Sequence, residues 1–507
     1  MTSLRNYVST MSRLDRRDLL LLGGATAFVA GLPSVAQSAE HQGAGPTPEP
    51  TDAEPADYTI RIAQSLVELA PETTISTKTY NGQFPGPLLR FTEGKRVVID
   101  IQNDTDSPEQ LHWHGQFLPA DVDGAAEEGT PFIPARGKRR IAFTPGPAGF
   151  RFYHSHVMAG ADLSAGLYSG QVGPVYIEPR HDPGAYDREV FLTLKEFGPH
   201  LSRTEMPADF LAPVNPLPRL REAAQAATKA AAEQGSGQGY ELAYSFFAVN
   251  DRMLGHAEPI RVKPGERLLL HVLNGSATEN RSLALPGHVF RVVALDGNPV
   301  PRPADVPVLW LGTGERVSAI VEMKRPGVWV LGDVNDEDRR RGMGIVVEYA
   351  GAKGKPAWKA ASKAFRWDYR VFAAPQAASQ PPDETLEMTF EARDAARGGF
   401  TEFSINRVAF SMDKMEPMFR LTRGKRYRLH MLNATDDVHP IHLHRHSFEL
   451  TNVAGMPLSG LVKDVAMIGA FQELAVDFTA DQPGFSLFHC HMQHHMDFGF
   501  MALFDCA

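Results

Sequence analysis

One 14-residue pattern occurs three times in this chain of 507 residues. It reads RFTEGKRVVIDIQN at 90–103, RVKPGERLLLHVLN at 261–274 and RLTRGKRYRLHMLN at 420–433. Each copy has a turn centred on glycine, followed by a β-rich run that ends at asparagine, which is typical of the start of a strand. Consecutive copies are separated by about the length of one domain, which is roughly 150 residues. The pattern therefore predicts three similar β-domains made by duplication, not a solenoid of short units.

The composition agrees with an all-β chain that has several cores. Hydrophobic residues make up 43% of the sequence, and 44 glycines and 38 prolines are spread along it, as expected of many short strands joined by turns. The net charge is −9 and no long basic run occurs, so we expect no nucleic-acid partner.

The first 36 residues resemble an export signal. Arg16 and Arg17 precede an apolar stretch at 19–32, and small residues follow at 34–36. This predicts a bacterial twin-arginine signal peptide over 1–36 and a mature protein that is periplasmic or secreted. A chance Arg-Arg in an ordinary secretory signal is the alternative, with the same destination. The stretch is shorter than a membrane span of about 20 residues, so we expect no stable membrane insertion after the signal is removed.

The rest of the chain divides by composition and by the repeat. An alanine-rich, helix-favouring run at 219–234 precedes a glycine-rich one at 235–239, which indicates an insertion that is either a surface excursion or a lid over the substrate site. The expected segments are a disordered N-terminus (37–56), domain one (57–182), domain two with a helical insertion at about 200–240 (183–350), a linker (351–383) and domain three (384–507).

Histidine pairs mark the outer copies of the repeat. The chain contains five His-x-His triplets among 19 histidines, and four of them take matching positions in the first and third copies. These pairs are His112/His114, His154/His156, His442/His444 and His489/His491. The middle copy has Leu283/Leu285 and Gly332/Val334 at the same offsets. The outer domains are therefore predicted to share a metal site, and the middle domain to act as a spacer.

Alternation along a strand predicts two separate sites. Residues two apart face the same way, so each pair presents two imidazoles to one side, and eight such ligands can hold three metals between domains one and three. Histidine alone suits copper, zinc, iron or nickel. Cys490 faces away from His489 and His491, toward His439 and His495, and one thiolate with two imidazoles is the ligand set of a blue-copper site.

These motifs resemble those of the multicopper oxidases, in particular three-domain bacterial laccase-like members. The residues that carry the resemblance are HWHG (112–115), HSH (154–156), HPIHLHRH (439–446), HCHMQHH (489–495) and YNGQFPGP (80–87). The resemblance implies three cupredoxin-like Greek-key β-sandwich domains and four copper ions. It implies these ligands: His439, Cys490 and His495 for type 1; His112 and His442 for type 2; His114, His154, His156, His444, His489 and His491 for the type 3 pair.

The position of the axial type 1 ligand in the family falls on Phe500, which cannot bind copper. A missing axial ligand with an apolar surround is expected to raise the reduction potential. The alternative is that Met501, one residue later, approaches the copper.

Proton supply needs an acid near the cluster, and Asp123 and Asp481 are the candidates for this relay. The alternative for each is a turn-forming aspartate. His446 is a candidate for orienting a ligand, and Arg445 stands where the family usually has glycine. Met496 replaces a glutamate that bacterial relatives often carry, which argues against a relay at that point.

The function expected from the resemblance is one-electron oxidation of phenolic or similar small substrates, coupled to four-electron reduction of dioxygen to water. One alternative is a metallo-oxidase acting on Cu(I) or Mn(II) in copper tolerance, since the thioethers of Met412, Met415 and Met418 lie close in sequence. A non-enzymatic periplasmic copper-binding or scaffold protein is a further alternative, but such relatives are expected to have lost ligands. Cys506 has no predicted internal partner.

Overall fold

The computed structural model describes residues 49–51, 53–179, 185–202, 216–222, 225–226, 240–359, 365–374 and 380–507. The predicted signal peptide lies outside the described residues, as do most of the predicted disordered N-terminus and large parts of the insertion and the linker. Within the insertion, residues 218–222 and 225–226 are helical. Among the described residues, no helix is both long and apolar enough to cross a membrane.

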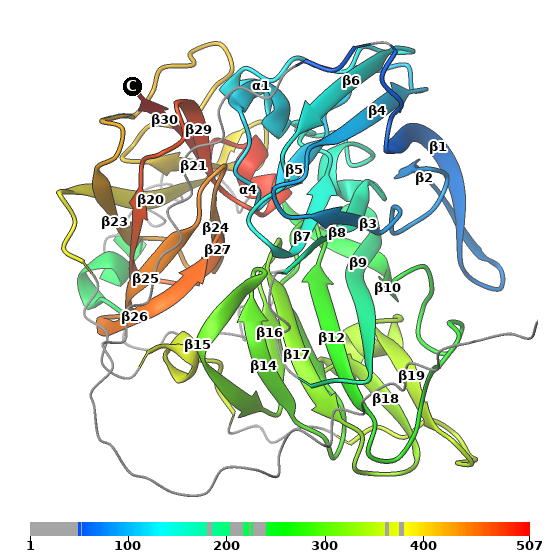
Figure 1. Cartoon of the computed structure of the whole chain (residues 1–507). Coiled ribbons are helices and arrows are strands. Elements are labelled where there is room, and N and C mark those ends of the chain that lie inside the picture. The colour runs from blue at the N-terminus through cyan, green and yellow to red at the C-terminus, as the bar shows by residue number, and fades with distance from the viewer. Residues whose placement is uncertain are drawn as a thin grey trace, which may run out of the picture. The chain divides into compact units, whose positions relative to one another are not determined.

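The described chain forms six sheets and a few short helices, so the predicted all-β fold is confirmed (Figure 1). Each copy of the repeat belongs to one pair of sheets. The first pair has the strand orders β2-β1-β4-β6 and β3-β8-β7-β5. Its strands are β1 (Tyr58–Ala70), β2 (Thr73–Tyr80), β3 (Leu89–Thr92), β4 (Val97–Asn103), β5 (His112–His114), β6 (Lys138–Phe143), β7 (Gly149–His154) and β8 (Val172–Glu178). Its short helices are α1 (Ala120–Asp123), η1 (Ala126–Glu128) and η2 (Gly166–Tyr168).

The middle pair of sheets has the orders β10-β9-β12-β17-β14-β15 and β11-β19-β18-β13-β16. Its strands are β9 (Arg188–Ser202), β10 (Glu241–Val249), β11 (Ile260–Val262), β12 (Arg267–Asn274), β13 (Arg281–Ala284), β14 (Phe290–Leu295), β15 (Asn298–Val306), β16 (Leu309–Leu311), β17 (Arg316–Glu322), β18 (Val328–Asp333) and β19 (Gly344–Tyr349). The helices α3 (Asp336–Arg340) and η4 (Tyr369–Phe372) follow β18 and β19.

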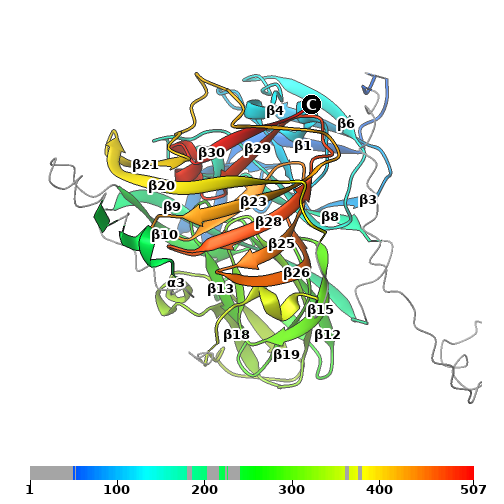
Figure 2. The ribbon, with the colours of Figure 1, turned by 90° about the vertical axis from the view of Figure 1, so that its left-hand side faces the viewer.

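The third pair has the orders β21-β20-β23-β28-β25-β26 and β22-β30-β29-β24-β27; Figure 2 shows the first of these sheets. Its strands are β20 (Glu384–Arg397), β21 (Phe400–Ile405), β22 (Phe419–Leu421), β23 (Arg426–Asn433), β24 (His439–Leu443), β25 (Phe448–Val453), β26 (Met456–Lys463), β27 (Val465–Ile468), β28 (Glu473–Thr479), β29 (Gly484–Cys490) and β30 (Met501–Cys506). Helix α4 (Gln493–Asp497) lies between the last two strands.

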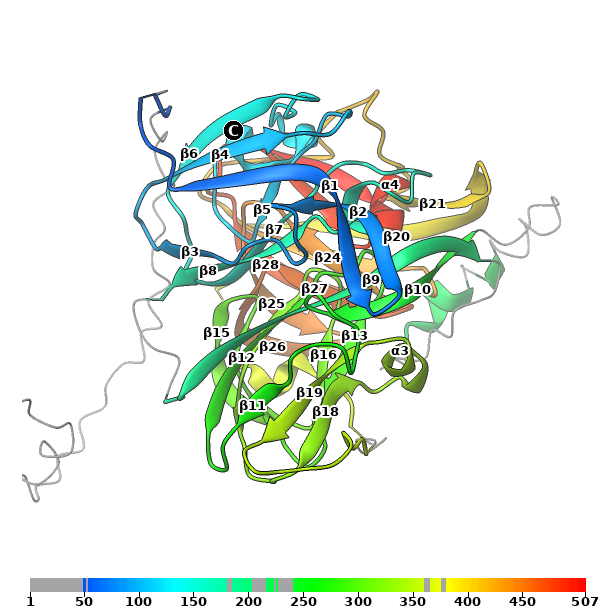
Figure 3. The ribbon, with the colours of Figure 1, turned by 90° about the vertical axis from the view of Figure 1, so that its right-hand side faces the viewer.

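All three copies of the repeat adopt the same local structure. Each begins in one sheet, turns at a glycine with positive φ and enters the other sheet of its pair, as β3–β4 does in the first pair (Figure 3). The asparagine that ends each copy is fully buried, and its side-chain amide donates to two or three backbone carbonyls across the following loop. The asparagine thus satisfies buried carbonyl groups at the point where the chain leaves the strand.

Strand pairing places the histidine pairs next to each other within each outer pair of sheets. His112 is opposite His154 where β5 pairs with β7, and His442 is opposite His489 where β24 pairs with β29. In the middle domain, Leu283 and Leu285 are buried in the hydrophobic core at the corresponding offsets. Apolar packing therefore replaces the imidazoles in that domain.

Candidate metal centre

The eight histidines of the four pairs meet at one buried place between the first and third pairs of sheets. The imidazole of His112 stacks on that of His444 with ring centroids 4.0 Å apart, and His114 stacks on His442 at 3.8 Å. All eight side chains are almost completely buried. Residues separated by more than 300 positions in the sequence thus form a single cluster.

Their ring nitrogens fall into three overlapping groups, in each of which the nitrogens lie within 4.8 Å of one another. One group is His112, His114 and His442, another is His114, His154 and His491, and the third is His156, His444 and His489. The structure therefore brings all the predicted type 2 and type 3 residues together.

Hydrogen bonds fix which nitrogen of each ring faces inward. Six rings donate one N–H to a protein oxygen: His112 to Asp123 O (3.0 Å), His114 to Asp464 Oδ1 (3.1 Å), His154 to Ser155 O (2.9 Å), His442 to Asp464 O (2.7 Å), His444 to Asp123 Oδ2 (2.9 Å) and His489 to Cys490 O (2.8 Å). The other nitrogen of each of these rings then carries a lone pair, which is the form that binds a metal.

The inward nitrogens fit a metal cluster. Nε2 of His112, His154, His156 and His442 is buried without a hydrogen-bond partner, and Nε2 of His491 lies 3.3 Å from Nδ1 of His114. Orphaned polar atoms in a protein interior are costly unless something binds them. Burial also lowers the pKa of seven of these rings, so they stay neutral and able to bind a metal ion: His114, His154, His156, His442, His444, His489 and His491.

A second ligand set lies on the other face of β29. Sγ of Cys490 is 3.4 Å from Nδ1 of His495 and 3.7 Å from Nδ1 of His439, and the two nitrogens are 3.0 Å apart. Burial raises the pKa of the Cys490 thiol far above its usual value, so a thiolate here requires a bound cation. Thr435 Oγ1, 2.6 Å from His439 Nε2, leaves the Nδ1 of His439 free to face the sulfur.

Aromatic side chains pack against this second ligand set. The ring of Phe500 lies 4.8 Å from that of His439 and 4.8 Å from that of Phe390, and the backbone N–H of Cys490 donates to the Phe500 carbonyl at 3.2 Å. Met501 belongs instead to a hydrophobic cluster with Leu487 and Leu503, because successive residues of a strand face opposite ways. The geometry places Phe500, not Met501, beside the cysteine.

Asp123 lies where a relay was predicted, against the histidine cluster. Its Oδ2 is 2.9 Å from His444 Nδ1 and 3.0 Å from His112 Nδ1, and its side chain is fully buried. Burial alone would raise the pKa of Asp123, but His112 and Arg445 lower it overall. The carboxylate is therefore ionised.

Two neighbouring glutamates were missed in the sequence. Glu128 hydrogen-bonds to Asp123, and burial with the charge of Asp123 raises the pKa of Glu128 well above its usual value. Burial raises the pKa of Glu127 to about 7, and its Oε2 lies 3.7 Å from His156 Nδ1. The sequence feature that could have indicated these glutamates is the acid-rich segment DVDGAAEEG at 121–129, shortly after the HWHG motif.

Asp481 lies farther out than Asp123. Its side chain is 32% exposed and its Oδ1 lies 3.8 Å from Nε2 of His446, whose Nδ1 donates to the carbonyl of His444. Asp481 therefore contacts the backbone of a cluster residue only through His446.

Arg445 has a definite structural role. It adopts a positive φ of 62°, and its guanidinium donates to the carbonyls of Leu118 (2.8 Å), Phe485 (2.5 Å) and Pro483 (2.8 Å). It thereby joins the loop after HWHG to the strand that carries the HCH motif. The second cysteine, Cys506, is a free thiol whose Sγ donates to the carbonyl of Ala480 at 3.6 Å.

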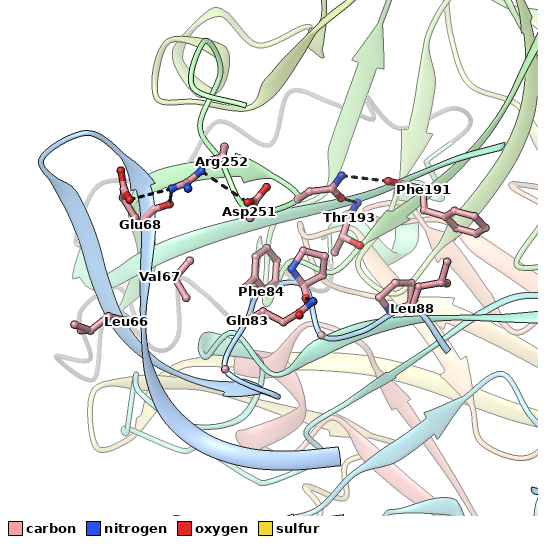
Figure 4. A pocket seen from close by; sticks show the side chains of 15 residues that line it. Leu66, Val67, Glu68, Gln83, Phe84, Leu88, Phe191, Thr193, Asp251 and Arg252 are labelled. Atoms are coloured by element: carbon pink, nitrogen blue, oxygen red, sulfur yellow. Dashed lines mark hydrogen bonds and ion pairs between the residues drawn. The ribbon is translucent and has the colours of Figure 1, made fainter. Parts of the chain in front are cut away.

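A separate cavity of about 490 Å³ lies between β1, the 82–88 loop and β9 (Figure 4). None of the candidate ligands lines it. Its polar groups bond to one another: Asn250 bonds to Thr193 and Phe191, and Arg252 pairs with Glu68 and Asp251. The cavity therefore has no part in the metal centre.

An all-β chain with a cysteine–histidine site joined to an eight-histidine cluster defines the class of copper oxidases. Family models described as multicopper oxidase match residues 61–182, 221–347 and 379–506. The chain belongs to the multicopper oxidase family and is an oxidoreductase.

Similarity to individual relatives extends over most of the chain. Multicopper oxidase MmcO of Mycobacterium tuberculosis (strain ATCC 25618 / H37Rv) is 28% identical over 85% of this chain and 83% of its own. The crystal structure of a multi-copper oxidase from Pseudomonas thermotolerans, 25% identical, covers 89% of this chain and 100% of its own with a TM-score of 0.66. Fet3p, a multicopper oxidase that functions in iron import, is 18% identical with a TM-score of 0.70, over 89% of this chain and 90% of its own.

Proposed function

We propose that this chain, loaded with four copper ions, takes electrons one at a time from a small reductant at His439, Cys490 and His495 and reduces dioxygen to water at the eight-histidine cluster. The observation that carries the proposal is the position of Cys490 in the second set, between His489 and His491 in the first. A few covalent bonds of one strand thus connect the two ligand sets.

The proposed ion assignment follows the nitrogen groups. His112 and His442 would hold the type 2 ion. The six type 3 residues divide into His114, His154 and His491 for one ion and His156, His444 and His489 for the other. Copper supplies the one-electron chemistry and the binding of dioxygen. The protein supplies neutral imidazoles in fixed tautomers and a buried thiol with two imidazoles.

Reduction of dioxygen consumes protons, and we assign their supply to the carboxyl groups beside the cluster. Glu128 holds a proton next to ionised Asp123, and Glu127 titrates near neutral pH beside His156. Two carboxyl groups whose pKa values are pushed apart form a pair in which one member stores the proton. Asp481 remains a candidate at the outer end, through His446.

The reductant binds at the edge of the cysteine site nearest solvent. His495 Nε2 lies 4.0 Å from Oδ2 of Asp437, whose side chain is 51% exposed. Asp436, Glu241 and Asp394 add negative charge around Asp437. Phenols and aromatic amines fit such an edge, and cationic reductants are favoured over anionic ones. This charge is the observation that keeps a metal-ion reductant as the second candidate.

The N-terminal sequence supports export from the cytoplasm. The Arg16–Arg17 pair and the apolar stretch after it favour the twin-arginine route to the periplasm or the medium. An enzyme exported already folded can acquire its metal before it leaves the cytoplasm or after.

The test is copper content, oxygen uptake and peroxide release of the mature protein. With a phenol as reductant we expect dioxygen to be consumed without release of peroxide. Cys490→Ser should lose the visible thiolate–copper absorption and steady-state turnover, yet keep the cluster copper. A protein that binds copper and consumes no dioxygen with a phenol, an aromatic amine or Cu(I) would contradict the proposal.

A further inference from the structure

The middle domain contributes a loop to the wall of the histidine cluster, although it carries none of the ligands. This loop joins β16 to β17 and has Gly314 at a φ of 79°. A Cβ atom on Gly314 would lie 2.8 Å from the Cδ2 and Nε2 atoms of His491. The backbone of the middle domain therefore packs directly on the imidazole of a cluster residue.

Arg316, at the end of this loop, forms a bidentate ion pair with Asp464 of the third domain. Its Nη1 lies 2.5 Å from Oδ1 and its Nη2 lies 2.6 Å from Oδ2, and both side chains are fully buried. Arg151 of the first domain adds a contact of 3.1 Å to Oδ2. Three domains thus meet at one carboxylate.

Asp464 is in turn bonded to two cluster histidines. Its Oδ1 accepts from His114 Nε2 at 3.1 Å, and its backbone carbonyl accepts from His442 Nδ1 at 2.7 Å. These bonds leave Nδ1 of His114 and Nε2 of His442 facing the cluster. Partners of this kind hold a metal-bound ring in one tautomer and one orientation.

The charges of this region balance without solvent. Lys463 contacts Asp296 at 2.8 Å and Glu315 at 3.0 Å, and the backbone N–H groups of Asp464 and Val465 donate to Asp296. The three buried cations, Arg151, Arg316 and Lys463, face three buried carboxylates, Asp296, Glu315 and Asp464. Removing one member leaves a buried charge unpaired, which is strongly destabilising. The fork of Arg316 is thus needed to hold the Asp464 carboxylate in place.

We infer that Arg316 is a positioning residue for oxygen reduction: through Asp464 it orients His114 and His442, which makes the copper-free domain a structural part of the cluster and more than a spacer. The inference rests on the proposed assignment of those two histidines as copper ligands. It requires that loss of the Arg316 guanidinium alters the copper-loaded histidine cluster and leaves the cysteine site unchanged.

The test compares Arg316→Lys with the matched control Arg281→Lys. Arg281 is also a fully buried arginine of the middle domain, paired with Asp338 at 2.6 Å and Glu196 at 3.6 Å, and it has no bond to a cluster residue. The readouts are the EPR spectrum of the type 2 ion, copper retained against a chelator, the visible absorption of the cysteine site, kcat and KM.

With Arg316→Lys we expect an altered type 2 EPR spectrum, cluster copper released about 10–100-fold more readily, and a lower kcat at unchanged KM and unchanged visible absorption. Arg281→Lys should change only thermal stability. If Arg316→Lys does not fold, Asp464→Asn provides the same comparison, since the amide keeps the shape and an acceptor for His114 but removes the charge.

Unchanged EPR spectrum, copper retention and kcat in the folded variant would overturn the inference, whatever its thermal stability. A wild-type protein that binds no copper at the histidine cluster would instead overturn the proposed function itself.

Discussion

Oδ2 of Asp123 lies 2.9 Å from Nδ1 of His444, so a carboxylate of the first domain orients a candidate ligand carried by the third. The same oxygen lies 3.0 Å from Nδ1 of His112. One side chain thus holds rings on both sides of the cluster.

Asp123→Ala should therefore weaken the cluster without unfolding the protein. We expect about 10–100-fold weaker retention of cluster copper, because His444 loses the acceptor that fixes its tautomer and His112 keeps only its bond to the backbone carbonyl. Asp123→Asn keeps one acceptor oxygen and should retain more copper. Copper per chain after dialysis against a chelator measures both effects. Asp121→Ala, an exposed position on the same short helix, is the control. Equal retention in Asp123→Ala and Asp121→Ala would contradict this role.

Phe500→Met should lower the reduction potential of the cysteine site with copper bound. The ring of Phe500 lies 4.8 Å from that of His439, so a thioether at this position can reach the axial position and stabilise the oxidised ion. A redox titration followed by the visible absorption measures the change. Met501→Leu should leave the potential unchanged, because Met501 packs on the opposite face of β30. A shift in the second variant and none in the first would reverse the assignment.

The metal-free protein should lose stability as the pH falls below about 6.5, the ordinary histidine value. Burial lowers the pKa of His439 and of His489 to about 3, so between pH 6.5 and 3 these rings bind protons in the unfolded chain and not in the folded one. Stability then falls with decreasing pH, by up to about 1.4 kcal/mol per pH unit for each such ring. Urea unfolding of the apo-protein across this range measures the slope. Buried carboxyl groups with a raised pKa, such as Glu127, act in the opposite direction, so the slope is compared with that of His439→Phe apo-protein. Equal slopes in the two proteins would mean that His439 takes up a proton in the folded state.

The sequence was enough to predict the all-β fold, the clustering of the eight histidines and the separate site at Cys490. The reason is geometric: a period of two sets which residues share a face of a strand, and the repeat sets which strands are equivalent. Both regularities can be recognised in the sequence itself, without knowledge of which domains are in contact.

Contacts between domains could not be read in this way. Arg316 and Asp464 are separated by 148 positions and belong to different domains, and nothing in the pattern around either one indicates the other. The loss of the histidine pairs from the middle domain predicts a spacer, and the pattern gives no sign of this contact. The glutamates at 127 and 128 looked like an ordinary polar loop, since their importance depends on burial that only the packed domains create.

Arg445 is the position where the departure from the usual glycine has a measurable consequence. An arginine at a φ of 62° bears a backbone cost of about 1 kcal/mol, which glycine would remove. Its guanidinium, however, satisfies the buried carbonyl of Leu118 and those of Phe485 and Pro483. We expect Arg445→Gly to destabilise the protein by about 1–3 kcal/mol in net terms, because a buried acceptor without a partner costs more than the strain that is relieved.

Arg407→Gly is the matched control: Arg407 has a φ of 65° and a side chain that is 88% exposed, so removing it should be neutral or slightly stabilising. Thermal unfolding of the two apo-proteins makes the comparison. If Arg445→Gly proves as stable as Arg407→Gly, the three carbonyl bonds contribute nothing and the arginine merely fills space.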